Sequence, residues 1–192
     1  MPVLDLLELP AATAPMTPLV GLDLGEKTIG VAVSDGTRTV ASPLQLIRRT
    51  KFTDDANALF KLMEGRGAGG VVIGLPVNMD GTEGPRCQSA RAFARNLIRL
   101  RDLPIAFWDE RLSSAAVNRM LIGEHDVNRK QRGEVVDKLA ATYILQGALE
   151  RLRNGDAGEP GDLAHGRGVD GHTGLLETSR QGLAVTVRRF KV

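Results

Sequence analysis

Three acidic residues from distant parts of the chain could act together as ligands of a divalent cation. Asp23 lies between two glycines in Gly21-Leu-Asp-Leu-Gly25, Glu110 ends an apolar run, and Asp137 precedes a run of small apolar residues. Clustered carboxylates repel one another, and some take up protons unless a cation lies between them. An oxygen-only ligand set suits Mg²⁺ or Mn²⁺, which can activate water and stabilise a phosphoryl displacement. The three acids therefore indicate a metal-dependent nuclease in which they bind the metal and catalyse the reaction.

Two of these acids also have a structural interpretation, which the local motif leaves open. The segment around Asp23 is compatible with a Gly-rich turn and a solvated carboxylate. Asp137 is compatible with an acidic residue in the first turn of a helix, where it complements the helix dipole. The two glycines favour a ligand beside Asp23, because bare positions on a strand leave room for an ion or a phosphate near the backbone. The choice depends on whether the fold brings the acids together.

The segments that carry these acids follow the order of an α/β domain. Apolar alternation and β-branched runs predict strands at 19–25, 28–33, 39–47, 70–76 and 104–110. Capping residues and apolar stripes predict helices at 53–65, 85–101, 114–122 and 134–153. The first two strands form an antiparallel hairpin, the third suits an edge because it contains Pro43, and the later strands are parallel. Thr53 and Gly65 are the expected ends of the first helix.

This order predicts that the acids converge at one edge of a mixed sheet. Ligand sites in such folds form at the carboxyl ends of strands, where Asp23 and Glu110 both lie. The last helix presents a face of small residues that can lie close to a sheet: Ala140, Ala141, Ile144 and Ala148. Asp137 is expected on the same face, in the first turn of that helix. Asp109 alternates away from Glu110 and Asp80 lies in a loop, so neither is expected at the site.

A second set of polar residues is expected to contact substrate phosphates, although each suits an ordinary loop or surface position equally well. These residues are Lys27, Thr28, Asn78, Arg111, Arg129, Lys130, Arg132 and Lys138. Three of them lie in a polar loop predicted at 123–133, directly before the helix that carries Asp137. Phosphate contacts carry little sequence information, and the chain has no base-reading motif, so RNA and DNA are both candidate substrates.

The composition fits one ordinary globular domain. Of 192 residues, 42% are hydrophobic and 25% are charged, and a net charge of +2 indicates no particular partner. The single cysteine excludes a disulfide framework and a thiolate metal site, and it agrees with a reducing cytoplasm. No apolar run approaches the length of a membrane helix and no export signal is recognised, so no membrane partner is expected. The oligomeric state is left open.

Three segments are expected along the chain. Residues 1–18 contain several prolines and a short Leu-rich piece, and they are expected to form a flexible extension outside the core. Residues 19–153 form the predicted α/β domain. Residues 154–192 are dominated by Gly, Pro and charged residues, and they are expected to form a mobile tail with a basic, strand-prone end.

Four motifs, in this order and spacing, resemble those of the YqgF-type family of pre-16S rRNA nucleases, also described as Holliday junction resolvases. They are Gly21-Leu-Asp-Leu-Gly25, Gly74-Leu-Pro-Val-Asn-Met-Asp-Gly-Thr82, Asp109-Glu-Arg-Leu-Ser113 and Val136-Asp-Lys-Leu-Ala-Ala-Thr142. The resemblance covers about residues 19–152. It implies a ribonuclease H-like fold, in which a mixed sheet of an antiparallel hairpin and parallel strands is flanked by helices. The family's acidic catalytic positions fall on Asp23, Glu110 and Asp137.

The resemblance also implies an activity and its partners. Such a protein would use Mg²⁺ or Mn²⁺ to hydrolyse phosphodiester bonds, leaving a 5′-phosphate and a 3′-hydroxyl. Its expected role is to process the 5′ end of pre-16S rRNA during ribosome biogenesis in the cytoplasm, in contact with structured nucleic acid and with the ribosome. The alternative within the same class is a DNA endonuclease that acts on branched DNA as a Holliday junction resolvase does.

Two other classes of protein fit parts of the sequence. An actin-like or sugar-kinase-like ATPase uses a similar Asp-x-Gly hairpin to hold phosphates, but that architecture needs two such domains and more chain than 192 residues supply. A noncatalytic nucleic-acid-binding or ribosome-binding module could have the same fold. The presence of all three acids favours the nuclease over this module.

Overall fold

A mixed sheet of five strands forms the centre of the protein. The computed structural model describes residues 3–112 and 129–155, with side chains in the second range described from residue 139 onward. The strands are β1 (Leu19–Leu24), β2 (Thr28–Ser34), β3 (Ala41–Arg48), β4 (Gly70–Leu75) and β5 (Ile105–Asp109). The ends of each strand lie within two residues of their predicted positions. Apolar periodicity therefore located the whole sheet.

The pairing of the strands confirms the predicted fold class. The strand order is β3-β2-β1-β4-β5. β2 is antiparallel to both β1 and β3, whereas β4 is parallel to both β1 and β5. An antiparallel hairpin thus continues into a parallel half, as in the ribonuclease H-like sheet predicted above. β3 is the expected edge strand, and the pairing register shifts between Val31 and Ala32, opposite Pro43.

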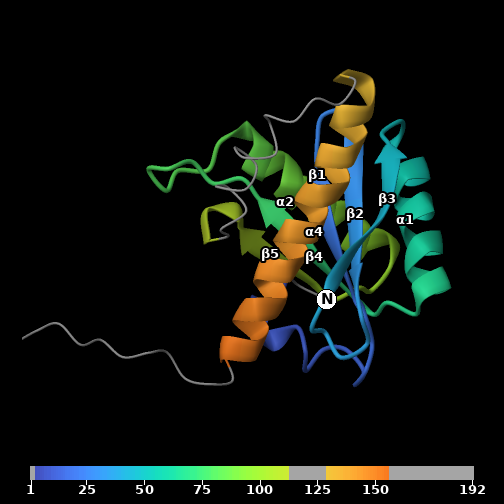
Figure 1. Ribbon diagram of the computed structural model, residues 1–192, viewed down its shortest axis with the longest axis vertical. Coiled ribbons are helices and arrows are strands. Elements are labelled where there is room, and N and C mark those ends of the chain that lie inside the picture. Colours follow the sequence, from blue (N-terminus) through green and yellow to red (C-terminus); the bar gives the residue numbers. More distant parts are fainter. Residues whose placement is uncertain (1–2, 113–128, 156–192) are drawn as a thin grey trace, which may run out of the picture. The chain divides into compact units, whose positions relative to one another are not determined.

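Helices cover both faces of this sheet. α1 (Phe52–Arg66) and α2 (Pro85–Leu100) pack on one face, and α4 (Arg129–Gly155) crosses the other (Figure 1). Two short 3-10 helices, η1 (Leu6–Glu8) and η2 (Glu110–Leu112), precede β1 and follow β5. None of the helices in the described part of the chain is long and apolar enough to cross a membrane. The predicted helix 114–122 lies outside the described residues.

The predicted ends of α1 are wrong. The N-cap is Lys51 rather than Thr53, and the buried Asp55 accepts a hydrogen bond from the backbone N–H of Thr50 at 2.9 Å. At the other end, the chain leaves the helix at Gly67, which has φ 62°. A left-handed C-cap favours glycine because it has no Cβ. Gly65 does not need that conformation and stays within the helix.

The start of α4 is also corrected. The helix begins at Arg129, although the sequence predicted a loop through residue 133 and a helix from residue 134. The segment Arg-Lys-Gln-Arg consists of good helix formers, and one glycine at position 133 costs a helix only about 1 kcal/mol. As a result, Arg129, Lys130 and Arg132 belong to the helix rather than to a loop. The structure does not describe the side chains of these three residues.

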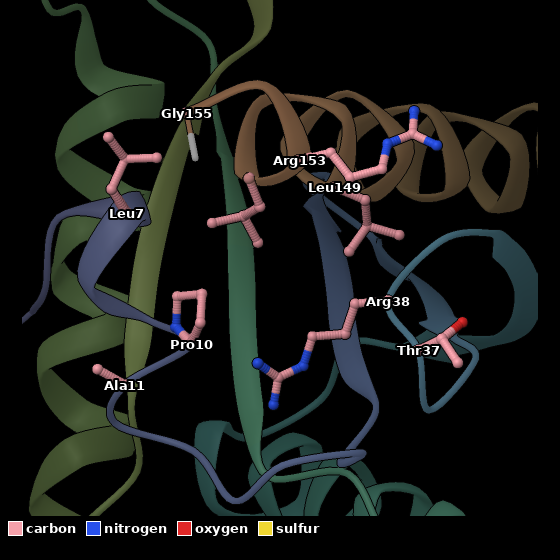
Figure 2. Close-up of a pocket in the computed structure, with 9 residues that line it drawn as sticks. Leu7, Pro10, Ala11, Thr37, Arg38, Leu149, Arg153 and Gly155 are labelled. Carbon is pink, nitrogen blue, oxygen red and sulfur yellow. The ribbon is translucent and has the colours of Figure 1, made fainter. Parts of the chain in front are cut away.

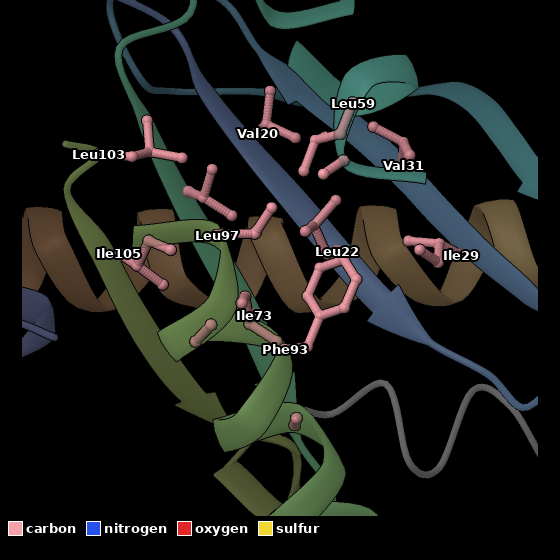
Figure 3. Close-up of a cluster of buried hydrophobic side chains, with 14 of the residues drawn as sticks. Val20, Leu22, Ile29, Val31, Leu59, Ile73, Phe93, Leu97, Leu103 and Ile105 are labelled. Carbon is pink, nitrogen blue, oxygen red and sulfur yellow. The ribbon is translucent and has the colours of Figure 1, made fainter. Parts of the chain in front are cut away.

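Two apolar clusters lie on the two faces of the sheet. The larger cluster joins β1, β2, β4 and β5 to α1 and α2, and Figure 3 shows Leu22 and Ile73 meeting Phe93 and Leu97 of α2. The second cluster joins the opposite face to α4 through Ala141, Ile144, Leu145, Ala148 and Leu149. The predicted small-residue face of the last helix is therefore confirmed, and α4 lies on the sheet through it.

Residues 3–18 also pack on the domain, so the expectation that they stay outside the core is wrong. Leu9 has no exposed surface and Leu6 is 9% exposed, and both belong to the cluster beneath α4. Arg38 donates hydrogen bonds to the carbonyl oxygen of Thr17 at 2.9 Å and to that of Ala14 at 3.0 Å. Apolar burial and these hydrogen bonds together fix this segment. The start of the domain at residue 19 is corrected with it, whereas the boundary between residues 153 and 154 remains a prediction.

Candidate active site

β1 places Asp23 on the face of the sheet that α4 covers. Leu19 belongs to the cluster beneath α4, whereas Val20 and Leu22 belong to the cluster beneath α1 and α2. Side chains alternate along a strand, so Asp23 lies on the same face as Leu19. It is half-buried and lies opposite Gly30 of β2 in the register. A strand paired on both sides therefore holds this carboxylate near its carboxyl end.

The Cβ positions of the two glycines around Asp23 are filled by the protein itself, which corrects the prediction that these bare positions hold a ligand. A Cβ at Gly21 would lie 2.6 Å from the Cβ of Leu145 and 3.0 Å from the carbonyl oxygen of Ala141. The bare position is thus filled by α4. A Cβ at Gly25 would lie 3.0 Å from the carbonyl oxygen of Thr28, within the β1–β2 turn. Both glycines serve close packing of the protein on itself.

Glu110 lies over a third glycine on the same face. A Cβ at Gly74 would lie 2.8 Å from Oε1 of Glu110 and 2.4 Å from Cδ1 of Ile144 in α4. Leu22 of β1 pairs with Ile73 of β4, so position 74 is next to position 23 on the neighbouring strand. Neighbouring strands are about 4.8 Å apart. The carboxylate of Glu110 therefore lies about one strand spacing from the position of Asp23, at the carboxyl edge of the sheet.

Asp137 lies on α4, but not in its first turn as predicted. Because α4 begins at Arg129, Asp137 lies about two turns further along, where the helix dipole gives little stabilisation. It lies one turn before Ala141, whose carbonyl oxygen approaches Gly21. The structure does not describe the side chain of Asp137. Among the side chains that the structure does describe, no three His, Cys, Asp or Glu residues form a group able to hold a metal.

Asp109 takes part in a separate polar cluster. Arg111 donates to Asp109 from Nε at 3.0 Å and from Nη2 at 2.6 Å, and this hydrogen bonding holds the pKa of Asp109 below its usual value. Nearby, the hydroxyl of Thr82 donates to Asp80 at 2.6 Å and lowers the pKa of that carboxyl in the same way. Arg111 also approaches the carbonyl oxygen of Asn78 at 3.4 Å. These interactions order the loop after β4.

The residues predicted to contact phosphates fall into three groups. Lys27 is exposed in the β1–β2 turn, and the half-buried Thr28 begins β2. Asn78 and Arg111 belong to the cluster around Asp109. The remaining residues lie on the N-terminal part of α4: Arg129, Lys130, Arg132 and Lys138. The first group thus lies directly beyond Asp23, whereas the guanidinium of Arg111 is already engaged by a carboxylate.

Two cavities lie at opposite ends of β1. One, of about 480 Å³, is bounded by η1, the β2–β3 turn and the end of α4, and Figure 2 shows Leu7, Pro10, Arg38 and Leu149 around it. Ser34, just before this turn, lies near the start of β1, because Val33 pairs with Val20. This cavity is therefore remote from Asp23. The other, of about 220 Å³, adjoins the carboxyl end of β1.

Arg49 and Arg86 line this second cavity, and neither residue was among the predicted phosphate contacts. Both are exposed arginines at the ends of elements, Arg49 just after β3 and Arg86 in the first turn of α2. A search for basic residues at the predicted strand and helix ends would have found them. Their meeting beside β1 depends on the tertiary fold, which the sequence pattern does not specify.

The family of the chain follows from its similarity to known proteins. The RuvX family model, described as Holliday junction resolvase, matches residues 17–151. The chain belongs to the RuvX family. The resemblance inferred from the four motifs is thereby confirmed, and the match includes the positions of Asp23, Glu110 and Asp137.

Relatives within the RuvX family align over most of this chain. A protein of Phenylobacterium zucineum (strain HLK1) is 77% identical over 155 residues, which make up 80% of this chain and 99% of that protein. A protein of Caulobacter sp. (strain K31) is 70% identical over 154 residues, 80% of this chain and 94% of that protein. Both bear the name "Putative pre-16S rRNA nuclease". A solved structure, T. thermophilus RuvC in complex with Holliday junction substrate, aligns over 71% of this chain and 96% of that chain, with a TM-score of 0.42 and 12% identity.

Proposed function

We propose that this protein is a metal-dependent nuclease that hydrolyses phosphodiester bonds, with Asp23, Glu110 and Asp137 as its catalytic and metal-binding residues. The principal support is the geometry around Gly74. The Glu110 carboxylate lies over that glycine, next to the position of Asp23 and on the same face of the sheet. Two carboxylates so arranged favour a shared cation, because side by side they repel each other.

The chemistry of this site fits a hard cation. Asp23 and Glu110 offer only oxygen ligands, which suit Mg²⁺ or Mn²⁺. A bound divalent cation would polarise the phosphodiester and lower the pKa of an attacking water. The chain's own contribution is position: β1 is paired on both sides, and the absence of a side chain at Gly74 leaves the space that the Glu110 carboxylate occupies. Rigid elements of this kind keep catalytic groups in a productive geometry.

We propose the 5′ end of pre-16S rRNA as the substrate, processed during ribosome biogenesis. The names of the relatives from Phenylobacterium and Caulobacter support this assignment, since these proteins are 77% and 70% identical to the chain. A precursor of ribosomal RNA would place the reaction in the cytoplasm and in contact with the ribosome. Branched DNA is the second candidate substrate, and it is favoured by the description of the family model that matches residues 17–151.

The remaining predicted contacts receive unequal support. Lys27 and Thr28 lie in the turn and strand directly after the end of β1, close enough in sequence to Asp23 to approach a phosphate held there. Arg111 is less suited, because its guanidinium already hydrogen-bonds Asp109. The proposed contacts on α4 are Arg129, Lys130, Arg132 and Lys138, which precede or follow Asp137 on the same helix.

The test is cleavage by the purified full-length chain. Two labelled substrates are compared, an RNA that carries the precursor 5′ end of 16S rRNA and a four-way DNA junction, each with Mg²⁺, with Mn²⁺ and with a chelator. We expect metal-dependent cleavage of the RNA that leaves a 5′-phosphate and a 3′-hydroxyl. Faster cleavage of the junction would favour the DNA substrate. Binding of either substrate without any cleavage would contradict the nuclease and support a noncatalytic binding module.

A further inference from the structure

The cavity of about 220 Å³ beside β1 is lined by residues from three separate segments. They are Leu24, Gly25, Glu26, Arg49, Pro85, Arg86 and Ser89. The lining begins at the residue directly after Asp23, and Leu24 packs against the cluster beneath α1 and α2. A water molecule occupies roughly 30 Å³ in the liquid, so the volume corresponds to about seven waters. This is enough for a phosphate group and its ester oxygens.

We propose that this cavity binds one backbone phosphate of the nucleic acid and thereby positions the strand at the acids. This role rests on the proposed nuclease function and adds Arg49 and Arg86 to it as positioning residues. Phosphate contacts fix the register of a bound strand without reading its bases. A strand held in the cavity would cross the carboxyl edge of the sheet to reach Asp23 and Glu110 on the other face. The cavity would then influence which bond is cut.

Arg49 is held in place before any ligand binds. Its Nη1 donates to the carbonyl oxygen of Gly25 at 2.7 Å, and its backbone N–H donates to that of Lys27 at 2.9 Å. Its guanidinium carbon also lies 6.0 Å from the centre of the Phe93 ring in α2. A guanidinium has five N–H donors, and one contact with Gly25 leaves others for a ligand. An arginine fixed in this way loses little freedom when it binds phosphate.

Arg86 supplies a second positive charge to the lining of the cavity. Its side chain is exposed, and it forms no hydrogen bond or ion pair with another described residue. Among the described residues that line the cavity, two are arginines and one is an acid, Glu26, so positive charge exceeds negative charge by one. The planar guanidinium matches the oxygens of a phosphate in a bidentate geometry. Charge and shape therefore both favour a phosphate over a neutral or cationic ligand.

The experiment measures binding of a labelled RNA that carries the 16S precursor 5′ end, in chelator, over a series of salt concentrations. Arg86→Gln is the test variant, and Arg99→Gln is its matched control, an exposed arginine near the other end of α2. We expect Arg86→Gln to weaken binding about tenfold, the effect of losing one charged hydrogen bond. The slope of log K against log salt should also fall by about 0.7 to 0.9, the change for one lost phosphate contact.

Two further measurements separate positioning from a general structural role. Arg86→Lys restores the charge and should restore the salt slope. In cleavage with Mg²⁺, Arg86→Gln should raise KM about tenfold and leave kcat within about twofold, since binding rather than the chemical step is affected. If the wild type binds and cleaves, equal losses in Arg86→Gln and Arg99→Gln, or a salt slope of Arg86→Gln equal to that of the wild type, would overturn the proposed phosphate site alone. Failure of the wild type to bind nucleic acid would overturn the proposed function as well.

Discussion

The two faces of the sheet are built in opposite ways. Beneath α1 and α2, large side chains such as Leu22, Ile73 and Phe93 fill the space between strand and helix. Beneath α4, β1 and β4 present Gly21 and Gly74, and the helix lies against them directly. The carboxylates of the candidate site lie on this second face. Leu19, Val72 and Trp108 fill other positions on this face, so the strands lack side-chain volume there only where the glycines lie, next to the acids.

Because of this difference, one face contributes mainly to folding stability and the other also positions the residues of the candidate site. A fully buried Leu, Ile or Phe side chain contributes about 1.5–3 kcal/mol to folding, so the face beneath α1 and α2 gains stability from volume. The face beneath α4 gains stability from the close approach of helix and strands. α4 itself has a bare position at Gly147, where a Cβ would lie 3.0 Å from the indole of Trp108. Changes on the first face should cost stability, and changes on the second should also alter the site.

The largest effect is expected from the acids on the α4 face. Replacing Asp23, Glu110 or Asp137 by the corresponding amide keeps the shape of the residue but removes the charge that we propose binds the metal. If each ligand contributes about 4 kcal/mol to transition-state stabilisation, cleavage should slow by roughly a thousandfold, because about 1.4 kcal/mol is a factor of ten. The measurement is single-turnover cleavage at saturating Mg²⁺, with unfolding midpoints in chelator to verify folding.

Asp109→Asn is the control for this set, because Asp109 hydrogen-bonds Arg111 and alternates away from Glu110. It should retain most of the activity. Near-normal cleavage by Asp137→Asn would contradict the three-carboxylate site. A loss in Asp109→Asn as large as that in Glu110→Gln would mean that the chemistry takes place on the other face.

The next effect concerns the N-terminal segment, which extends the α4 face. Leu9 is fully buried beneath α4, so Leu9→Ala should destabilise the protein by about 2–5 kcal/mol. Leu7→Ala is the control, because Leu7 is 45% exposed. Chemical denaturation measures both changes. If Leu9→Ala costs no more than Leu7→Ala, the segment contributes nothing to the face and the domain begins at β1.

A smaller effect is expected where one carbon atom is added beneath α4. In Gly21→Ala the new Cβ would come within 2.6 Å of Leu145 and close to the backbone of α4, so the helix must shift, at a cost of about 1–3 kcal/mol. Gly65→Ala is the opposite case. Apart from its neighbours and the backbone of α1 itself, no atom of the described residues lies within 4 Å of its Cβ position, and the gain in helix propensity should stabilise the protein by about 0.5–1 kcal/mol. If both variants change the free energy of unfolding in the same direction, the proposed close packing beneath α4 is contradicted.

The smallest effect is expected outside both faces, in the turn after β2. Hydrogen bonds from the Thr37 hydroxyl and from the backbone N–H groups of Val40 and Thr39 lower the pKa of Asp35 from 3.8 to about 2. A lowered pKa adds stability that is fully present above the ordinary value of 3.8 and is lost as the pH falls through about 2. The unfolding midpoint of the wild type should therefore fall more steeply over that range than that of Asp35→Asn. Parallel curves would show that the turn does not contribute.

The sequence located those features that depend on local periodicity. The continuous apolar run of β4 predicted a buried strand, and alternation predicted that Asp109 points away from Glu110 before any contact was known. It did not reveal what fills a bare position. Gly21 has the same sequence pattern whether a phosphate or a helix lies against it, and only the tertiary fold distinguishes the two.

The remaining errors have a similar origin. Leu6 and Leu9 lie in a proline-rich stretch whose pattern is too short to predict burial, and they are buried because α4 and the sheet form a surface for them. Gly67 rather than Gly65 ends α1 because the turn that follows requires a positive φ at that position. Arg49 and Arg86 are far apart in sequence, and the fold brings both to the same cavity beside β1.

The pairing of Leu4 with β5 also affects how the protein behaves toward other chains. The outer strands of the sheet are β3 and β5. The backbone N–H of Leu4 donates to the carbonyl oxygen of Ile105 at 2.9 Å and covers part of the β5 edge, while Pro43 and the register shift interrupt the β3 edge. Uncovered strand edges recruit further strands and lead to aggregation. Removal of the first residues should therefore favour self-association in addition to lowering the free energy of unfolding.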